Sequence, residues 1–416
     1  MRSRCWAAAL LVVCVCFMAF SSVTIAKTEL TILVSNHPAW IDYHKDALEG
    51  FEKANPDITV SIIPGHITNL KINAAGNVPM DVMYLPGDTF TEAIDPGIIR
   101  ELQSFIDNDK SFRLSEFFPG AVDAHRYKGV ICGLPQVVSP VVLLYNKTMF
   151  DEVGMPYPTA NWNWDTVVNN GRKLTIDKDN DGHPDQYAWS YHSWTLYNRW
   201  PMFVWQNGGD VFNQDGTKMI LDRPEAVEAV KYYGDLAMLH DIAPLPRNRI
   251  MYGASYTQLF NDNKLAMATQ TRYYKPPDTV DYDITHVPMG KTRATTLITN
   301  YYGILSTSKH PNEAWRLVRY LLTVPTVKEK LDKAAPAIPA YRPNAVALIR
   351  AEINAPRKEV VWLEALEYAR GPYYPPVSGF VSLVEKHFNN YATGTLPAQT
   401  MAEQFTQEVN ALLAKR

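Results

Sequence analysis

Cysteine is scarce in this chain. Three of the four cysteines, Cys5, Cys14 and Cys16, lie within the first 26 of 416 residues, and only Cys132 lies beyond them. Residues 27–416 therefore cannot form an internal disulfide bond, and a hydrophobic core must stabilise them. A chain of this length can bury enough surface for such a core and is typical of two domains rather than one.

Long hydrophobic runs are also missing, apart from one at the N-terminus. Ala7–Phe20 is apolar throughout, follows Arg2 and Arg4, and precedes the small-x-small sequence Thr24–Ala26. This pattern predicts a secretory signal peptide, residues 1–26, that is cleaved after Ala26. The run is shorter than the roughly 20 apolar residues that span a bilayer, and no later run approaches that length.

We expect residues 27–416 to be exported and soluble, either periplasmic or extracellular. A lipid-anchored form through Cys14 or Cys16 is the less favoured alternative, since the residues before these cysteines lack the small side chains that a lipobox prefers. Without Arg2 and Arg4, the 40 Lys and Arg residues become 38 against 43 Asp and Glu, a net charge near −5. That charge, without a basic stripe, argues against nucleic-acid binding.

Catalytic motifs are absent as well. The sequence has no Gly-x-Ser-x-Gly, no His-Glu-x-x-His and no Gly-x-x-x-x-Gly-Lys-Ser/Thr motif. Cys132 lies in an apolar stretch, which fits an inert buried thiol better than a nucleophile. A carboxylate pair for glycoside hydrolysis has no sequence motif, because such a pair is defined by its separation in space.

The expected mature chain opens with a strand–helix–strand pattern. Glu29–Ser35 alternates as a strand, Tyr43–Ala54 is helical, and Ile58–Ile63 and Met80–Leu85 read as further strands. Ligands of open α/β sheets bind at the carboxyl ends of strands, so polar and aromatic residues there are binding candidates. These candidates are Asn36, His37, Trp40, Asp88 and Gln136. For His37, a capping or solvent-exposed histidine is the preferred alternative.

Aromatic residues gather in one part of the chain. Six of the ten tryptophans lie between Trp162 and Trp205, with tyrosines among them. Aromatic faces pack against the C–H faces of sugar rings, but large aromatics also fill protein cores. We assign Trp164 and Trp200 to the core. The binding candidates are Trp189, Tyr191, Trp194 and Trp205.

An acidic loop resembles the start of a calcium-binding loop. Its carboxylates are Asp177, Asp179, Asp181 and Asp185, with Gly182 at the sixth position. The twelfth position is Ala188, where an EF-hand needs a bidentate Glu. The four aspartates are therefore weak metal candidates, and a structural turn is the better interpretation.

Three longer segments carry a resemblance to a known family. Trp200–Leu239 combines an aromatic cluster, an Asn-Gly-Gly turn, two short strands and a helix with Asp222 as its N-cap and Glu225 three residues on. Tyr127–Phe150 has Gly-Leu-Pro before a strand that ends in Tyr-Asn-Lys, and Asp281–Leu322 has Val-Pro-Met-Gly before a strand and a helix. In this order the segments resemble the extracellular solute-binding proteins (family 1) of bacterial ABC importers, of the sugar-binding, maltose-binding-like type.

The resemblance implies an α/β fold of two lobes, the type II-like periplasmic-binding-protein class. Each lobe would be a helix-flanked β-sheet, with the ligand cleft between the lobes. The expected N-terminal lobe comprises residues 27–137 and 292–335, and the C-terminal lobe residues 138–291 and 336–416. The chain should cross between them near Pro135–Pro140, Val287–Gly290 and Ala334–Ala340.

The resemblance also points to binding residues late in the chain. Phe260–Lys275 matches a family segment whose final loop presents an aromatic side chain to the ligand, and here that loop contains Arg272 and Tyr273. An arginine there would suit a ligand with a carboxylate or phosphate group, and an ion pair of Arg272 with a surface acid is an equal alternative. Further candidates from the same resemblance are Asn300, Tyr301 and Arg342.

By this resemblance, the protein captures a small-molecule ligand, a carbohydrate or sugar derivative, by hinge closure. It would deliver that ligand to the membrane permease subunits of an ABC transporter, as a monomer and without a cofactor. The main alternative is a secreted carbohydrate-active enzyme, a hydrolase or lyase, with a carboxylate pair in the same cleft. A binding protein for a membrane sensor, or one for a polyamine, a metal or glycerol phosphate, is a further alternative.

Overall fold

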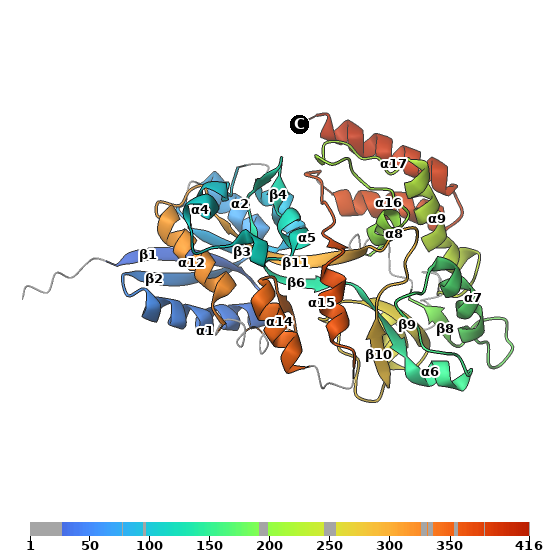
Figure 1. Ribbon diagram of the computed structural model, residues 1–416. Helices are drawn as coiled ribbons and strands as arrows, with labels where there is room; N and C mark the ends of the chain where they lie inside the picture. Colours follow the sequence, from blue (N-terminus) through green and yellow to red (C-terminus); the bar gives the residue numbers. More distant parts are fainter. Residues whose placement is uncertain are drawn as a thin grey trace, which may run out of the picture.

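The computed structural model describes residues 27–76, 78–94, 97–190, 199–244, 255–325, 331, 336–352, 357–377 and 379–415. These residues form two lobes, each built on its own β-sheet (Figure 1). The lobe that contains the start of the chain, in blue, lies on the left of Figure 1, and the other lobe, largely green and yellow, lies on the right.

Strands from distant parts of the sequence form the sheet of the N-terminal lobe. Among the described residues they are β1 (Thr28–Ser35), β2 (Ile58–Gly65), β3 (Val82–Pro86), β6 (Leu134–Pro140), β11 (Thr295–Ile304), β12 (Ile338–Pro339) and β13 (Ala369–Arg370). Their order is β12–β6–β11–β3–β1–β2, with β13 beside β11. Because β1 is parallel to both β2 and β3, the loops after Ser35 and Pro86 leave the same edge of the sheet.

Helices pack on both faces of this sheet. They are α1 (Pro38–Ala54), α2 (Ile67–Ala75), η1 (Gly87–Thr89), α3 (Phe90–Ile94), α4 (Gln103–Asn108), η2 (Leu114–Glu116), α5 (Pro119–Asp123), α12 (Pro311–Thr323), α14 (Arg342–Ala351) and α15 (Val360–Leu366). Alternate side chains of a strand point to opposite faces. Accordingly, Ile32 and Val34 of β1 lie in one core with α1 and α12, and Leu33 lies in another with α2 and α3.

The sequence of α1 explains its place. Pro38 stands in its first turn, where a missing N–H and a fixed φ cost nothing. Tyr43, Ala47 and Phe51 recur at helical spacing and are buried against the sheet. At the other end the Asn55 side-chain amide donates to the Phe51 carbonyl, 2.9 Å away, and the helix stops. The strand–helix–strand pattern predicted from the sequence is confirmed.

The C-terminal lobe is built on a smaller, mixed sheet, which contains both antiparallel and parallel strand pairs. Its described strands are β7 (Val142–Asn146), β8 (Tyr187–Trp189), β9 (Leu265–Gln270) and β10 (Tyr282–Thr285), in the order β10–β7–β9–β8. The helices of this lobe are α6 (Lys147–Glu152), α7 (Trp164–Leu174), α8 (Pro201–Gln206), α9 (Pro224–Met238), α11 (Tyr256–Asn261), α16 (Phe380–Ala392) and α17 (Ala398–Leu413). A separate hairpin joins β4 (Arg126–Tyr127) to β5 (Val130–Ile131).

Two local predictions for Trp200–Leu239 are wrong. Where two short strands were predicted, the structure has a single β-bridge between Phe212 and Met219. Helix α9 begins at Pro224 with Arg223 as its N-cap, so Asp222 does not cap it. Proline is favoured at the first helical position, and its fixed φ sets the start of the helix here.

The two lobes are joined at the centre of the molecule. β6 leads after Val141 directly into β7, and the long strand β11 follows the segment after β10. The sequence-based boundaries assigned residues 336–416 to the C-terminal lobe. In the structure β12 pairs with β6, and α14 and α15 pack in the core of the N-terminal lobe, whereas α16 and α17 pack in the second core.

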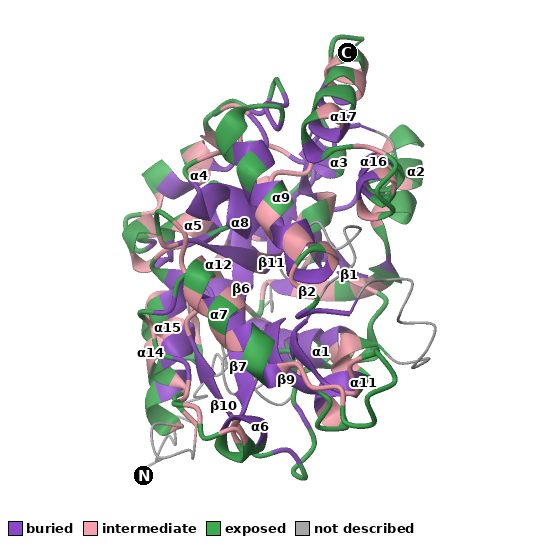
Figure 2. Cartoon of the chain, turned by 90° about the vertical axis from the view of Figure 1, so that its right-hand side faces the viewer, coloured by how far each residue is buried: buried purple, intermediate pink, exposed green. Residues whose placement is uncertain are grey.

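Buried residues concentrate in the sheets and on the inner sides of the helices (Figure 2). Trp200 lies in the second core at 1% exposure, and Trp164 stacks on Tyr232 with ring centroids 4.0 Å apart. Both tryptophans therefore have the structural role predicted for them. None of the helices in the described residues has the length and apolar content to cross a membrane.

Candidate functional site

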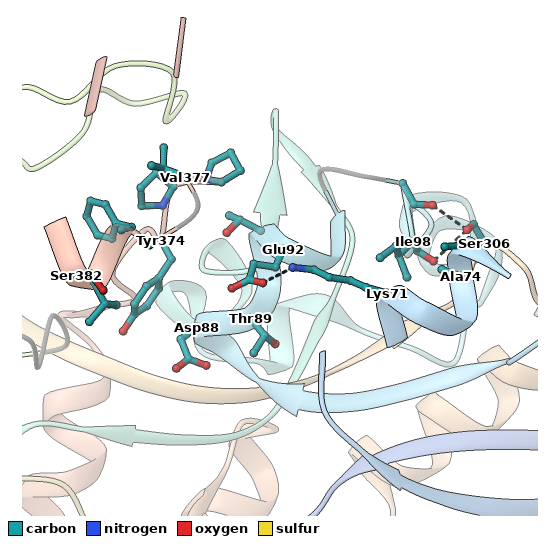
Figure 3. A pocket seen from close by; sticks show the side chains of 18 of the residues that line it. Lys71, Ala74, Asp88, Thr89, Glu92, Ile98, Ser306, Tyr374, Val377 and Ser382 are labelled. Carbon is teal, nitrogen blue, oxygen red and sulfur yellow. Dashed lines mark hydrogen bonds and ion pairs between the residues drawn. The ribbon is translucent and has the colours of Figure 1, made fainter. Parts of the chain in front are cut away.

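A cavity of about 850 Å³ lies between the two lobes (Figure 3). The N-terminal lobe lines it with residues of α2, η1 and α3, and the C-terminal lobe lines it with residues 374–377 and the start of α16. This volume is within the range of small-molecule sites, roughly 300–1,000 Å³. The cavity is therefore the candidate ligand site.

Asp88 forms part of the N-terminal wall. It lies in η1, directly after β3, and the Thr89 hydroxyl holds this turn by donating to the Pro86 carbonyl at 2.7 Å. Desolvation by the surrounding protein raises the pKa of the Asp88 carboxyl, and the nearby Glu92 raises it further. Within the described residues Asp88 makes no ion pair. Its carboxylate can therefore accept hydrogen bonds from a ligand.

Gly87 allows this turn to pack closely on β11. A Cβ atom at this position would lie 2.2 Å from the Thr299 hydroxyl and 3.1 Å from the Thr299 carbonyl oxygen. Both distances are too short for a methyl group. The glycine thus places Asp88 at the cavity by letting the backbone approach the neighbouring strand.

Lys71 and Glu92 form an ion pair further along the same wall. Lys71 comes from α2 and Glu92 from α3, and both side chains are partly exposed. Figure 3 shows the pair extending over the cavity wall, away from Asp88. Because each charge compensates the other, this pair adds no net charge to the cavity.

Tyr374 faces Asp88 from the C-terminal lobe (Figure 3). Burial raises the pKa of the Tyr374 hydroxyl, the negative charge of Asp88 raises it further, and the positive charge of Arg199 lowers it. The phenol thus lies within reach of an acid from one lobe and a cation from the other. Burial also lowers the pKa of Arg199. Apolar groups of Pro375, Val377, Phe380 and Val381 complete this wall.

The binding candidates near the start of the chain lie in different environments. Asn36 and His37 are exposed in the loop after β1, and His37 makes no side-chain cap to α1. Trp40 is buried, with its ring centroid 5.2 Å from that of Tyr84. None of the three lines the described cavity.

Gln136, Asn300 and Tyr301 lie inside the N-terminal lobe. The Asn300 side-chain amide donates to the Tyr84 hydroxyl at 3.1 Å. Gln136 is 4% exposed, and neither atom of its amide finds a hydrogen-bond partner among the described residues. Tyr301 is fully buried. Tyr273 belongs to the C-terminal lobe and keeps 37% of its surface exposed. Burial raises the pKa of the Tyr84 hydroxyl, and the nearby Tyr273 raises it further.

The aromatic candidates of the second lobe are buried where they are described. Trp189 on β8 is 1% exposed. The Trp205 indole N–H donates to Asp210 at 3.0 Å, and the guanidinium of Arg370 lies 4.7 Å from its ring centroid. The ring face that Arg370 covers is closed to a sugar. Tyr191 and Trp194 lie outside the described residues.

Both arginine candidates already have acidic partners. Arg272 pairs with Glu352, and its Nε lies 3.8 Å from Glu359. Arg342 pairs with Glu367 and stacks on the Phe118 ring at 4.4 Å. These contacts match the ion-pair alternative raised from the sequence for Arg272. Neither arginine lines the cavity between the lobes.

The acidic loop forms a turn held by its own backbone. Asp177, Asp179 and Asp185 place one carboxylate oxygen each within 4.8 Å of one another. The Asp177 carboxylate accepts from the Gly182 N–H at 2.9 Å, and the Asp185 carboxylate accepts from the Lys178 N–H at 2.7 Å. The Asp181 carboxylate accepts from the His183 N–H at 2.8 Å instead of joining the group. These bonds favour the structural-turn interpretation.

Sequence reasoning missed the residues that the C-terminal lobe contributes to the cavity. Tyr374 lies in the run Pro372-Tyr-Tyr-Pro-Pro376, where prolines prevent regular structure and leave aromatic side chains in a loop. That composition was the available signal. Val381 has no comparable signal, because only the tertiary fold brings it to the cavity.

Comparisons with known proteins identify the family and the fold of this chain. The family model of bacterial extracellular solute-binding proteins matches residues 37–327. A binding protein of Brucella abortus (strain 2308) is 25% identical over 293 residues, 67% of this chain and 68% of that protein. An arabinooligosaccharide-binding protein of Halalkalibacterium halodurans is 27% identical over 39% of this chain and 34% of its own length. The structure of an ABC substrate-binding protein from Listeria monocytogenes in complex with cycloalternan has a TM-score of 0.76 at 24% identity and covers 93% of this chain and 99% of that one. This chain therefore belongs to the family of bacterial extracellular solute-binding proteins.

Proposed function

We propose that this protein is the substrate-binding component of an ABC importer and that it captures a carbohydrate between its lobes. One observation carries the proposal. Both lobes line a single cavity, with Asp88 on one wall and Tyr374 on the other. A small molecule in this cavity contacts both lobes at once.

The chemistry of the cavity suits a ligand rich in hydroxyl groups. The Asp88 carboxylate accepts hydrogen bonds, and the Tyr374 phenol can donate or accept one. Phe380 and Val381 offer apolar surface for the C–H face of a sugar ring. The relatives give the same direction, since the Listeria protein was solved with cycloalternan and the Halalkalibacterium protein is named for arabino-oligosaccharides.

Contacts to both lobes supply the driving force for closure. A ligand shifts a conformational equilibrium only by its difference in affinity for the two states. A sugar held by Asp88 alone would favour neither state, whereas one held also by Tyr374 favours the state that brings the lobes together. Hinge closure of this kind is a known response of two-lobe binding proteins.

Export and delivery belong to the same proposal. The signal-peptide pattern of residues 1–26 would direct the protein out of the cytoplasm. Outside the cytoplasm it acts as a monomer. The closed form would then present the sugar to membrane permease subunits. Membership of the solute-binding family supports this step.

A thermal-shift screen of residues 27–416 tests the proposal. The panel contains neutral mono- and oligosaccharides, sugar acids, sugar phosphates, polyamines and calcium chloride. A ligand at about 100 times its Kd adds about 2.7 kcal/mol to the unfolding free energy, which is a visible shift. We expect a shift with a saccharide that is recovered intact. If the saccharide that causes the shift is broken down, the protein is instead an enzyme. If no sugar in the panel shifts the Tm, the proposal is contradicted.

A further inference from the structure

A smaller cavity of about 300 Å³ lies beside strand β10. Among the described residues it shares no lining residue with the cavity that contains Asp88. Residues of β10 and of the segment after β9 line it from the C-terminal lobe, and residues at the end of α14 and in α15 line it as well. Helix α15 contacts β6 of one sheet and β7 of the other, in keeping with its central place in Figure 1. We call this space the β10 cavity.

Positive charge exceeds negative charge in the lining of the β10 cavity. Its cations, among the described residues, are Arg272, Lys275 and Arg357. Its carboxylates are Glu352 and Glu359. Both carboxylates pair with Arg272, and Nε of Arg357 lies 3.5 Å from Glu359. Lys275 is exposed and makes no ion pair with any described residue. Three cations against two carboxylates leave one positive charge without a counter-charge in the lining.

Arg357 has hydrogen-bonding capacity left over. Its guanidinium lies over the Tyr282 ring, 4.8 Å from the ring centroid, and a cation–π contact of this kind consumes no N–H group. Its other contact, with Glu359, involves Nε. The Nη groups make no hydrogen bond within the described part of the chain, although a guanidinium has five N–H donors. Arg357 is therefore restrained by its neighbours and still able to donate to a ligand.

Trp362 supplies a second, independent observation. It lies on α15 in the cavity lining and is 4% exposed. Its indole N–H makes no hydrogen bond to a described residue, and it is not among the unpartnered polar atoms that are sealed from solvent. A buried indole N–H usually has a partner. Because Trp362 lines the β10 cavity, an acceptor inside that cavity would supply the missing hydrogen bond.

The rest of the lining is apolar. Leu144 and Ile284 are each 2% exposed, and their side chains adjoin the cavity together with the indole ring. Donors without acceptors beside apolar surface suit an anion that carries a small hydrocarbon part. A carboxylate matches the planar guanidinium with two parallel hydrogen bonds. A volume of about 300 Å³ is at the small end of ligand sites.

We propose that the β10 cavity is a second binding site, for a small organic monocarboxylate. The carboxylate accepts hydrogen bonds from Arg357, from Lys275 and from the indole N–H of Trp362. Its hydrocarbon part packs on Leu144 and Ile284. One negative charge balances the one positive charge of the lining that has no counter-charge. The site does not depend on the function proposed above, because it lies outside the cavity assigned to the carbohydrate.

Calorimetry and thermal unfolding of residues 27–416 test this site. The probes are sodium acetate, propionate, butyrate and benzoate, at constant ionic strength with sodium chloride as the reference. We expect the Tm to rise in a saturable manner with a carboxylate but not with chloride. Each methylene group that reaches the apolar surface should tighten binding about fourfold from acetate to butyrate. Absence of carboxylate binding would overturn the proposal, as would sodium phosphate that binds as tightly as the best carboxylate.

Charge variants locate the binding. Lys275→Gln and Arg357→Gln each remove a charged donor, so each should weaken carboxylate binding by about tenfold or more. Lys173→Gln removes the same charge from an exposed position on α7, away from the cavity lining, and is the matched control. It should bind the carboxylate as the wild-type protein does. Wild-type affinity in both Lys275→Gln and Arg357→Gln would contradict the site.

Trp362→Phe tests the indole N–H by itself. The ring remains aromatic, and we expect carboxylate binding to weaken by about three- to tenfold through the loss of one hydrogen bond. Trp315→Phe is the comparison, since its indole N–H donates to Asp109 at 3.0 Å. It should lower the Tm more than Trp362→Phe does and leave carboxylate binding unchanged. Wild-type carboxylate affinity in Trp362→Phe would show that the indole N–H is not part of the site. Failure of every carboxylate, with saccharide binding intact, would overturn this site alone.

Discussion

Asp88 and Tyr374 approach each other across the cavity from different lobes. Burial raises the pKa of the Tyr374 hydroxyl, and the carboxylate of Asp88 adds to that rise from the opposite wall. The two residues come from widely separated parts of the sequence, and Tyr374 also packs against the hydrophobic core of the C-terminal lobe. Tyr374 therefore contacts the core of its own lobe and also lines the cavity opposite Asp88.

Replacing Asp88 should weaken saccharide binding while the fold stays intact. Asp88→Asn removes a charged acceptor, and hydrogen bonds to charged groups contribute about 1.5–3 kcal/mol, so we expect Kd to rise about 10- to 100-fold. The Tm without ligand should stay near the wild-type value, because Asp88 has no ion pair among the described residues. Calorimetry with the best saccharide of the screen measures the change.

The matched control for Asp88→Asn is Glu49→Gln, an exposed position on α1 in the same lobe. It also removes one negative charge, but it lies away from the cavity lining. We expect it to bind as the wild-type protein does. Equal weakening by both variants would mean that the overall charge, rather than Asp88, controls affinity.

The fold could be read from the sequence wherever a pattern is local. The alternation in β1 and the helical spacing of Tyr43, Ala47 and Phe51 record which side of each element is buried, so these elements were predicted correctly. The segment after Trp200 was harder, since its glycine turns permit several conformations. There the tertiary packing leaves one bridge where two strands were expected.

The candidate site could be read only in part, for the same reason. Asp88 follows a buried strand, and the position of a residue after a strand is visible in sequence. Trp205 looked like a stacking platform, but Arg370, from a distant strand, covers its ring. Tyr374 reaches the cavity through the packing of α16 and its preceding loop on the second lobe. Contacts between distant segments leave no periodic pattern, so sequence reasoning could not assign them.

Arg272 should matter for stability more than for binding. Arg272→Ala would leave Glu352 and Glu359 without this cation. The Glu359 side chain is 12% exposed, whereas that of Glu352 keeps 35% of its surface exposed. We expect the unfolding free energy to fall by roughly 1–2 kcal/mol, between the values of exposed and buried pairs. Urea unfolding measures the loss. Arg342→Ala, whose pair with Glu367 is more exposed, is the control and should lose less. A selective loss of affinity for sugar acids in Arg272→Ala would instead assign Arg272 to the ligand.

Two buried histidines should make the protein sensitive to acid. Burial lowers the pKa of His44 and of His125 from 6.5 to about 4. Nδ1–H of His44 donates to the Trp40 carbonyl at 2.6 Å and its Nε2 accepts from the Tyr302 hydroxyl at 2.9 Å, a pattern that uses the neutral ring. Between pH 6.5 and about 4, these two histidines take up protons in the unfolded chain but stay neutral in the folded protein. The stabilisation is therefore complete above pH 6.5 and is lost as the pH falls toward 4.

Between pH 7.5 and 5.0, each histidine should account for a loss of about 2 kcal/mol in unfolding free energy. Urea unfolding at both pH values measures it. The variant His125→Gln cannot take up the proton, so its loss over the same interval should be smaller by about that amount. The carboxylates contribute equally to both proteins and cancel in the comparison. An identical loss in the variant would show that His125 does not titrate as its burial requires.

Gly87 should be necessary for placing Asp88. In Gly87→Ala the new methyl group would meet the Thr299 hydroxyl, so η1 must move away from β11 and carry Asp88 with it. We expect a loss of about 1–3 kcal/mol in unfolding free energy, typical of overpacking, together with weaker saccharide binding. Gly76→Ala is the control, because its φ is −82° and its nearest contacts lie at 3.5–3.7 Å, which is ordinary packing.

A double variant separates the steric effect from a general loss of stability. Thr299→Ala removes the hydroxyl that the new Cβ would meet and leaves the 3.1 Å contact with the carbonyl oxygen and an ordinary 3.5 Å contact with the Cβ atom of residue 299. Added to Gly87→Ala, it should restore much of the saccharide affinity even though His125 loses its bond from Thr299. If affinity stays low while the double variant folds, the position of Asp88 does not depend on the approach of η1 to β11. Recovery of saccharide affinity would show that the close packing of η1 on β11 fixes the position of the Asp88 carboxylate, the acceptor for the ligand.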